Sequence, residues 1–224
     1  WTVVKLIVQE IPPIWSAAIR MLIAAAAALI AQCVSGQFII PKRHDLSIIL
    51  VIMLFNMVAG SVLMALGVQF VSVGRSVVLG YTTPLWVAPG AWFFLHESLA
   101  RRQIIGVLIG LCGLMALFNP LALDWTNSHI VAGNIMLLSS AFSWAITILF
   151  IRSYVWHSTP FQLLFWQCLP AGLILTVMAL SIEGPLSFTL TPSLAALLFY
   201  CGVPATALAY WAMAILNRSL PAPT

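Results

Sequence analysis

Residues 161–182 read FQLLFWQCLPAGLILTVMALSI, a run of 22 residues without one charged side chain. A helix needs about 20 predominantly apolar residues to cross the hydrocarbon core of a bilayer. The run is too long and too continuously apolar for a barrel strand, whose hydrophobicity alternates over about ten residues. It therefore predicts a transmembrane helix.

The same pattern extends along the whole chain of 224 residues, in which 62% of positions are hydrophobic and 6% are charged. The mean hydropathy is +1.09. After an apolar stub at 1–8, further apolar runs lie at 14–35, 46–70, 76–95, 104–118, 130–151 and 194–216. The sequence therefore predicts an all-α integral membrane protein, a multi-helix bundle of about seven full crossings plus the stub.

Basic residues in the loops predict the orientation of the bundle. Those on one side are Lys42, Arg43, Arg101, Arg102, Arg152 and Arg218, whereas Arg75 lies on the other side. Because cytoplasmic loops carry the excess of Lys and Arg, we expect the basic side of this multi-pass protein to be cytoplasmic. The scattered bases form no continuous face, so nucleic acid is not an expected partner.

The cysteines and histidines predict no metal site. Cys33, Cys112, Cys168 and Cys201 lie inside apolar runs without CxxC spacing, and the four histidines share no ligand spacing. No GxxxxGK[ST] run, the signature of a phosphate-binding loop, is present.

An internal repeat appears when the second half is moved onto the first by 147 positions. The aligned pairs are Lys5 with Arg152, Pro13 with Pro160, Arg20 with Gln167 and Ser72 with Ser219. Lys5 lies in a segment that leaves the cell and Arg152 in one that enters it, so the repeats cross the membrane in opposite senses. Inverted repeats of this kind can open a shared site alternately to each side. We assign 1–118 to the first repeat, 119–129 to a connecting loop and 130–224 to the second repeat.

The order of these motifs resembles the EamA-type transporters of the drug/metabolite transporter superfamily. The matching residues are Lys5, Pro13, Arg20, Gly74-Arg75-Ser76, Tyr81-Thr82-Thr83-Pro84-Leu85, Phe94-Leu95-His96-Glu97, Ser143-Trp144-Ala145, Tyr210-Trp211-Ala212 and Arg218-Ser219-Leu220-Pro221-Ala222. The resemblance implies two inverted five-helix repeats in the plasma membrane, the inner membrane of a bacterium. It also implies a secondary carrier that needs no bound cofactor and no ATP. It also implies that most of the first helix and the last two helices are missing here.

Two charged residues are candidates for the substrate site. Lys5 and Arg20 lie at or within the outer part of two adjacent crossings, where a charge is costly unless it faces water or the bundle interior. We expect them to attract an anionic group of a substrate. The alternative is snorkelling to the headgroups, which is easier for Lys5 than for Arg20.

A polar helix face provides further candidates for the translocation pathway. Ser140, Ser143, Trp144 and Thr147 recur at i, i+3, i+4 and i+7 and share one face. This face either lines the path, with Trp144 stacking on a substrate, or packs closely on a neighbouring helix.

Other uncharged residues are candidates for the translocation pathway, and each also has a purely structural interpretation. Gln167, in the place of Arg20, and Asn56 either face the path or join helices by hydrogen bonds. Tyr210 presents its hydroxyl to the path or anchors the helix at the interface. Tyr81 is a pathway candidate and Pro84 a hinge candidate in the middle of run 76–95, where the alternative is a static kink.

The leading functional prediction is a secondary transporter that exports a small metabolite, amino acid-like or related, by alternating access. A non-transporting membrane scaffold is the second prediction, since Gly106, Gly110 and Gly113 allow close approach of another helix, within the protomer or in a homodimer. A lipid-modifying intramembrane enzyme is the third. It would need clustered nucleophiles, carboxylates or metal ligands, which the sequence does not show, so we predict no enzyme.

Overall fold

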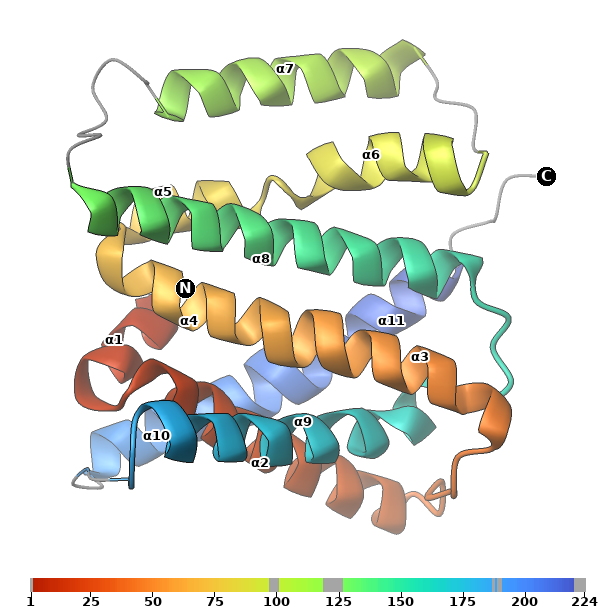
Figure 1. Ribbon diagram of the computed structural model, residues 1–224. Coiled ribbons are helices and arrows are strands. Elements are labelled where there is room, and N and C mark those ends of the chain that lie inside the picture. Colours follow the sequence, from red (N-terminus) through yellow and green to blue (C-terminus); the bar gives the residue numbers. More distant parts are fainter. Residues whose placement is uncertain (1, 97–100, 119–126, 187, 189–190, 220–224) are drawn as a thin grey trace.

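The computed structural model describes residues 2–96, 101–118, 127–186, 188 and 191–219, and every regular element in these ranges is helical (Figure 1). The α-helices are α1 (Thr2–Glu10), α2 (Pro13–Val34), α3 (Leu46–Val51), α4 (Ser61–Phe70), α5 (Val73–Gly80), α6 (Thr83–Phe94), α7 (Arg101–Phe118), α8 (Ser128–Ser153), α9 (Pro160–Ile182), α10 (Pro192–Gly202) and α11 (Ala209–Ser219). A 3-10 turn, η1 (Arg43–Asp45), precedes α3, and the π-helical segments are η2 (Ile52–Gly60) and η3 (Val203–Leu208).

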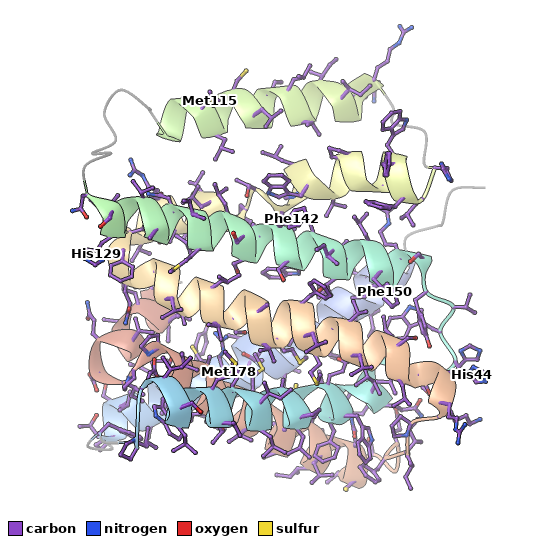
Figure 2. The ribbon with its side chains drawn as sticks, viewed as in Figure 1. His44, Met115, His129, Phe142, Phe150 and Met178 are labelled. Carbon is purple, nitrogen blue, oxygen red and sulfur yellow. The ribbon has the colours of Figure 1, made fainter. Side chains whose placement is uncertain are left out.

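Five of the described helical spans are long and apolar enough to cross a membrane. They are Pro13–Val34, Arg43–Phe70, Ser128–Ser153, Pro160–Ile182 and Pro192–Leu216, and a shorter apolar helix covers Ile104–Ala116. The prediction of an all-α membrane bundle is confirmed. Helix α7 is the outermost layer in Figure 2, where Met115 is 63% exposed.

The run 76–95, in which Pro84 predicts a kink, is divided into two helices, because the chain leaves the helix between α5 and α6. Pro84 has no N–H to bond to Gly80, and Thr83 Oγ1 donates to that carbonyl at 2.9 Å instead. Thr82 Oγ1 donates to Leu79 O at 2.6 Å. Pro84 therefore lies in the first turn of α6, after a complete break, and its role as a hinge stays a prediction.

Helices α2 and α9 form an antiparallel pair in the core of the bundle. At one end the Glu183 carboxylate accepts the backbone N–H groups of Ile14 and Trp15, both at 2.9 Å. At the other end Gln32 Nε2 donates to Phe161 O at 2.5 Å. The start of α2 thus meets the end of α9, and the end of α2 meets the start of α9.

Small residues let the α2–α9 pair approach closely. The buried alanines of α2 are Ala17, Ala18, Ala24, Ala25 and Ala28. On α9, a Cβ added at Gly172 would lie 2.8 Å from Leu22 Cδ2 and 3.3 Å from the Leu22 backbone nitrogen. Helices in lipid associate through such close van der Waals packing, because lipid gives them no hydrophobic driving force.

The helices around this pair exchange partners between the two halves of the chain. Helix α8 packs on α4, and α1 packs on α10. Likewise η2 packs on α9, and η3 packs on α2. In each pair one element comes from the first half and the other from the second.

The loops that carry most of the basic residues lie at one end of the bundle. The segment between α2 and α3, the start of α7 and the end of α8 are at the right of Figure 1, whereas α5, with Arg75, is at the left. His44 and His129 mark these two ends in Figure 2. The right-hand end is the one that the basic residues predict to be cytoplasmic.

Contacts between two loops hold this basic end together. The Asp45 carboxylate accepts from Ser158 Oγ at 2.8 Å, and the Tyr154 hydroxyl donates to His44 O. The His44 and His157 rings stack with centroids 5.3 Å apart. The loop between α8 and α9 is thereby fixed on the start of the α3 segment.

Replacing Glu183 with alanine should destabilise the bundle by about 1–2 kcal/mol, because the first turn of α2 loses a charged acceptor for two N–H groups. Thermal unfolding of the full-length protein in detergent measures the effect, and Glu183→Gln should lie between Glu183→Ala and the unchanged protein. Glu10→Ala, at an exposed carboxylate, is the matched control. Equal melting temperatures for the two alanine variants would contradict the capping role.

Candidate functional site

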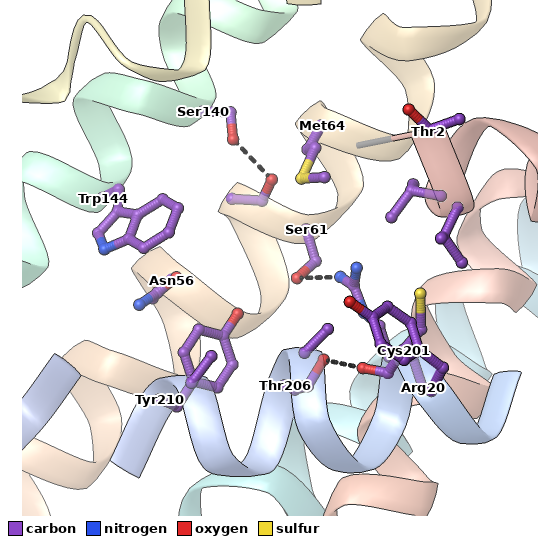
Figure 3. A pocket seen from close by; sticks show the side chains of 16 residues that line it. Thr2, Arg20, Asn56, Ser61, Met64, Ser140, Trp144, Cys201, Thr206 and Tyr210 are labelled. Atoms are coloured by element: carbon purple, nitrogen blue, oxygen red, sulfur yellow. Dashed lines mark hydrogen bonds between the residues drawn. The ribbon is translucent and has the colours of Figure 1, made fainter. Parts of the chain in front are cut away.

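A cavity of about 430 Å³ lies among α1, α2, η2, α4, α8, α10, η3 and α11 (Figure 3). This volume falls within the range of roughly 300–1,000 Å³ that is common for small-molecule sites. Both halves of the chain contribute to its wall. The cavity therefore lies where two inverted repeats would share a site.

Arg20 is the only charged residue among the described residues that line the cavity. Its Nη2 donates to Ser61 Oγ at 3.0 Å, and its Nε is buried without a hydrogen-bond partner. Gly202 brings α10 against α2 at this point, because an added Cβ would lie 2.5 Å from Ile23 Cγ2 and 3.3 Å from Arg20 O. Close packing of α2 thus fixes the backbone that carries the guanidinium.

The two π-helical segments both contribute to the cavity wall. Asn56 and Gly60 come from η2, and Ala205 and Thr206 come from η3. Shifted by the same 147 positions as the repeat, Asn56 falls on residue 203, the first residue of η3. In η3, Thr206 Oγ1 donates to Cys201 O at 2.6 Å. Local π-helical turns are frequent at functional sites.

Asn56 and Trp144 form another part of the cavity wall, together with Ser140. Asn56 Nδ2 and Trp144 Nε1 are buried and have no hydrogen-bond partner. Ser140 Oγ donates to Gly60 O at 2.8 Å, which joins α8 to η2. Figure 3 shows Trp144 and Asn56 on the side of the cavity away from Arg20.

Half of the sequence candidates meet in this cavity. Its lining includes Arg20, Asn56, Ser140, Trp144 and Tyr210, and the last of these lies within interaction range of Arg20 and Ser61.

The prediction missed other lining residues, among them Thr2, Ser61, Met64, Tyr200, Cys201 and Thr206. Ser61 and Thr206 are polar residues inside apolar runs, a signal that could have identified them. Such hydroxyls often bond only to their own helix. The signal therefore does not distinguish a residue that lines the pathway from one that packs helices together.

The structure places Lys5 outside the cavity lining, where it has a clear partner. Its Nζ donates to Val71 O at 2.7 Å, and Val71 is the residue that ends α4. A cation at the C-terminus of a helix also interacts favourably with the helix dipole. Lys5 therefore joins α1 to the end of α4.

Four further candidates also lie outside the cavity lining. Ser143 Oγ donates to Phe55 O at 2.5 Å, and Thr147 Oγ1 donates to Ser143 O at 3.3 Å. Gln167 is buried in α9, and Tyr81 is 72% exposed. The contact of Ser143 with η2 is the helix packing that was the alternative for the polar face of α8. Their pathway roles stay predictions.

The described residues contain no group of three or more His, Cys, Asp or Glu side chains that could hold a metal ion. The cavity offers hydrogen-bond donors, one positive charge and aromatic surface. Such a wall can bind and orient a small solute.

Comparisons with known proteins identify the family. The sequence profile of the EamA-like transporter family matches residues 1–119 and 131–224. The uncharacterized transporter YoaV of Bacillus subtilis (strain 168) is 26% identical over 185 residues, which cover 82% of this chain and 63% of YoaV. The uncharacterized transporter YetK of the same organism is 30% identical over 139 residues, which cover 61% of this chain and 42% of YetK.

A solved crystal structure shares the fold. It superposes with a TM-score of 0.74 and 16% sequence identity, covering 97% of this chain and 74% of the other. The chain thus spans less than two thirds of the length of YoaV and YetK. With its apolar helices and the match to both halves, this multi-pass membrane protein belongs to the EamA-like transporter family, within the drug/metabolite transporter superfamily.

Proposed function

We propose that the full-length protein is a secondary transporter that exports a small carboxylate-bearing metabolite, an amino acid or a related acid, across the bacterial inner membrane. The observation that carries the proposal is Arg20, the one charged residue among the described residues that line a cavity of about 430 Å³. The cavity is the proposed substrate site.

The electrostatics of the cavity support an anionic group on the substrate. A positive charge inside a membrane bundle is costly unless it meets water or a counter-charge. None of the described acidic side chains lines the cavity. The carboxylate of a bound solute would supply the counter-charge, and Ser61 already orients the guanidinium.

The arrangement of the helices supports alternating access. The wall contains elements of both halves. Helix α4 packs on α8 and α10 packs on α1, so each contacts the first helix of the opposite half. A site at the interface of inverted repeats can face each side of the membrane in turn. The proposed transport cycle consists of such an exchange around the α2–α9 pair.

Replacing Arg20 with glutamine should lower the exchange of anionic solutes roughly 10- to 100-fold at subsaturating concentration, the cost of losing a charge-assisted hydrogen bond. Solute counterflow in liposomes with the full-length protein measures this loss over amino acids and related acids. Arg101→Gln, at an exposed residue of α7, is the matched control.

Unchanged exchange in Arg20→Gln would reject Arg20 as the binding group while leaving transport intact. A folded protein that exchanges no solute at all would reject the transporter and favour the scaffold.

In contrast to Arg20→Gln, Lys5→Gln should lower the stability of the protein and leave solute binding nearly unchanged. Loss of the bond to Val71 O should cost about 1 kcal/mol of stability and lower the melting temperature by about 2–4 °C. The KM for solute exchange should stay within about twofold, because Lys5 does not line the cavity. A variant that keeps its melting temperature and loses affinity would place Lys5 in the substrate site instead.

A further inference from the structure

Three polar side chains form one cluster in the cavity wall. Arg20 and Ser61 are joined by a hydrogen bond, and Tyr210 lies within interaction range of both. Figure 3 shows the ring of Tyr210 extending from α11 toward Ser61, which lies between Tyr210 and Arg20 in this view. All three residues line the cavity, so an occupant would meet them together.

Two polar atoms of this cluster remain accessible to an occupant. Arg20 is partly exposed, and its Nη2 donates to Ser61 Oγ at 3.0 Å. Its Nη1 makes no hydrogen bond with a described residue and, in contrast to Nε, is not buried. Tyr210 is also partly exposed, and its hydroxyl is not among the buried polar atoms without a partner. A solute in the cavity can therefore reach Arg20 Nη1 and the Tyr210 hydroxyl.

The cluster can direct two protons at one anionic group. The guanidinium of Arg20 only donates, and Ser61 Oγ accepts from it, so the Ser61 proton is available to the Tyr210 oxygen. Hydroxyl protons rotate to suit their partners, and a charged acceptor forms the stronger bond. The Tyr210 proton would therefore turn to a bound carboxylate, whose other oxygen accepts from Arg20 Nη1.

The two donors come from different halves of the chain. Arg20 lies in α2, and Tyr210 lies in α11, which follows η3 directly. Helix α2 packs on η3, which brings the two residues to the same part of the cavity. A carboxylate that accepts from both residues would join the halves across the substrate site.

Resting on the proposed function, we infer that Tyr210 is a specificity-determining residue that binds the substrate carboxylate together with Arg20, one donor from each half of the chain. Arg20 supplies the charge, and the Tyr210 hydroxyl supplies a directed hydrogen bond. An uncharged carboxamide of the same shape accepts this bond less strongly. The proposed function needs Arg20 alone, so the role of Tyr210 can fail separately.

Hexanoate, its uncharged match hexanamide and the amino acid L-norleucine test this role. Tyr210→Phe removes the hydroxyl and keeps the ring. Binding to the purified full-length protein is measured by thermal stabilisation over a range of solute concentrations. We expect Tyr210→Phe to weaken hexanoate and L-norleucine roughly tenfold, the cost of a hydrogen bond to a charged group, and to weaken hexanamide less than about threefold.

A double-mutant cycle tests whether Arg20 and Tyr210 bind the same group. Arg20→Gln, Tyr210→Phe and the double variant are compared in counterflow of L-norleucine into liposomes. Tyr210→Phe should raise the KM roughly tenfold on its own and less than about threefold in the Arg20→Gln background. Side chains that share one partner do not act independently, so the two effects should not add.

Tyr154→Phe is the matched control for loss of a tyrosine hydroxyl. The Tyr154 hydroxyl donates to His44 O at the basic end, and Tyr154 does not line the cavity. This variant should lower the melting temperature of the protein without solute, because a hydrogen bond is lost. Its affinity for hexanoate should stay within about twofold of the unchanged protein.

The outcomes separate the two proposals. Unchanged affinity for both carboxylates in Tyr210→Phe, equal losses for hexanoate and hexanamide, or additive effects with Arg20→Gln would each overturn the role of Tyr210 and leave the transporter intact. Absence of binding and exchange of both carboxylates by the unchanged protein would overturn the carboxylate site of the proposed function, and this inference with it.

Discussion

Polar groups inside an apolar bundle must find their partners within the protein or in water, because lipid offers none. The fold depends on this constraint. Glu183 accepts from the first turn of α2, and Lys5 donates to the carbonyl of Val71, the residue that follows α4. The threonines after α5 donate to carbonyls where the helix breaks. Each contact joins or ends helices at a position where backbone groups would otherwise be left unpaired.

The cavity wall is one of the places where buried polar groups have no hydrogen-bond partner. Arg20, Asn56 and Trp144 keep unpaired donors in a wall that is otherwise well bonded. Such groups reduce the stability of the protein. Buried unpaired atoms also lie outside the cavity lining, at Gln32 Oε1, Asp45 Oδ1 and Asn134 Oδ1, so unpaired atoms alone do not identify the cavity as a binding site.

The sequence was sufficient to predict the helices but not the cavity. Long apolar runs and the prolines at 13 and 160 marked helices that the structure confirms. Pro84 predicts a kink in run 76–95, but the full break before α6 could not be predicted, because hydropathy does not register hydroxyls that bond to carbonyls. Ser61 and Thr206 were missed, and Lys5 lies outside the cavity, because the direction of a side chain depends on packing between segments far apart in the chain.

The exchange of packing partners makes the two halves interlocked. Helix α2 emerges from the ribosome well before α9, and α4 emerges before α8, so the faces on which these later helices pack have no protein partner at first. The first half can therefore insert into the membrane but cannot complete its core. Its small-residue faces contact lipid until the later helices are made. Assembly of the bundle is a late event in synthesis, and a cut between the halves would leave two mutually dependent fragments rather than two autonomous domains.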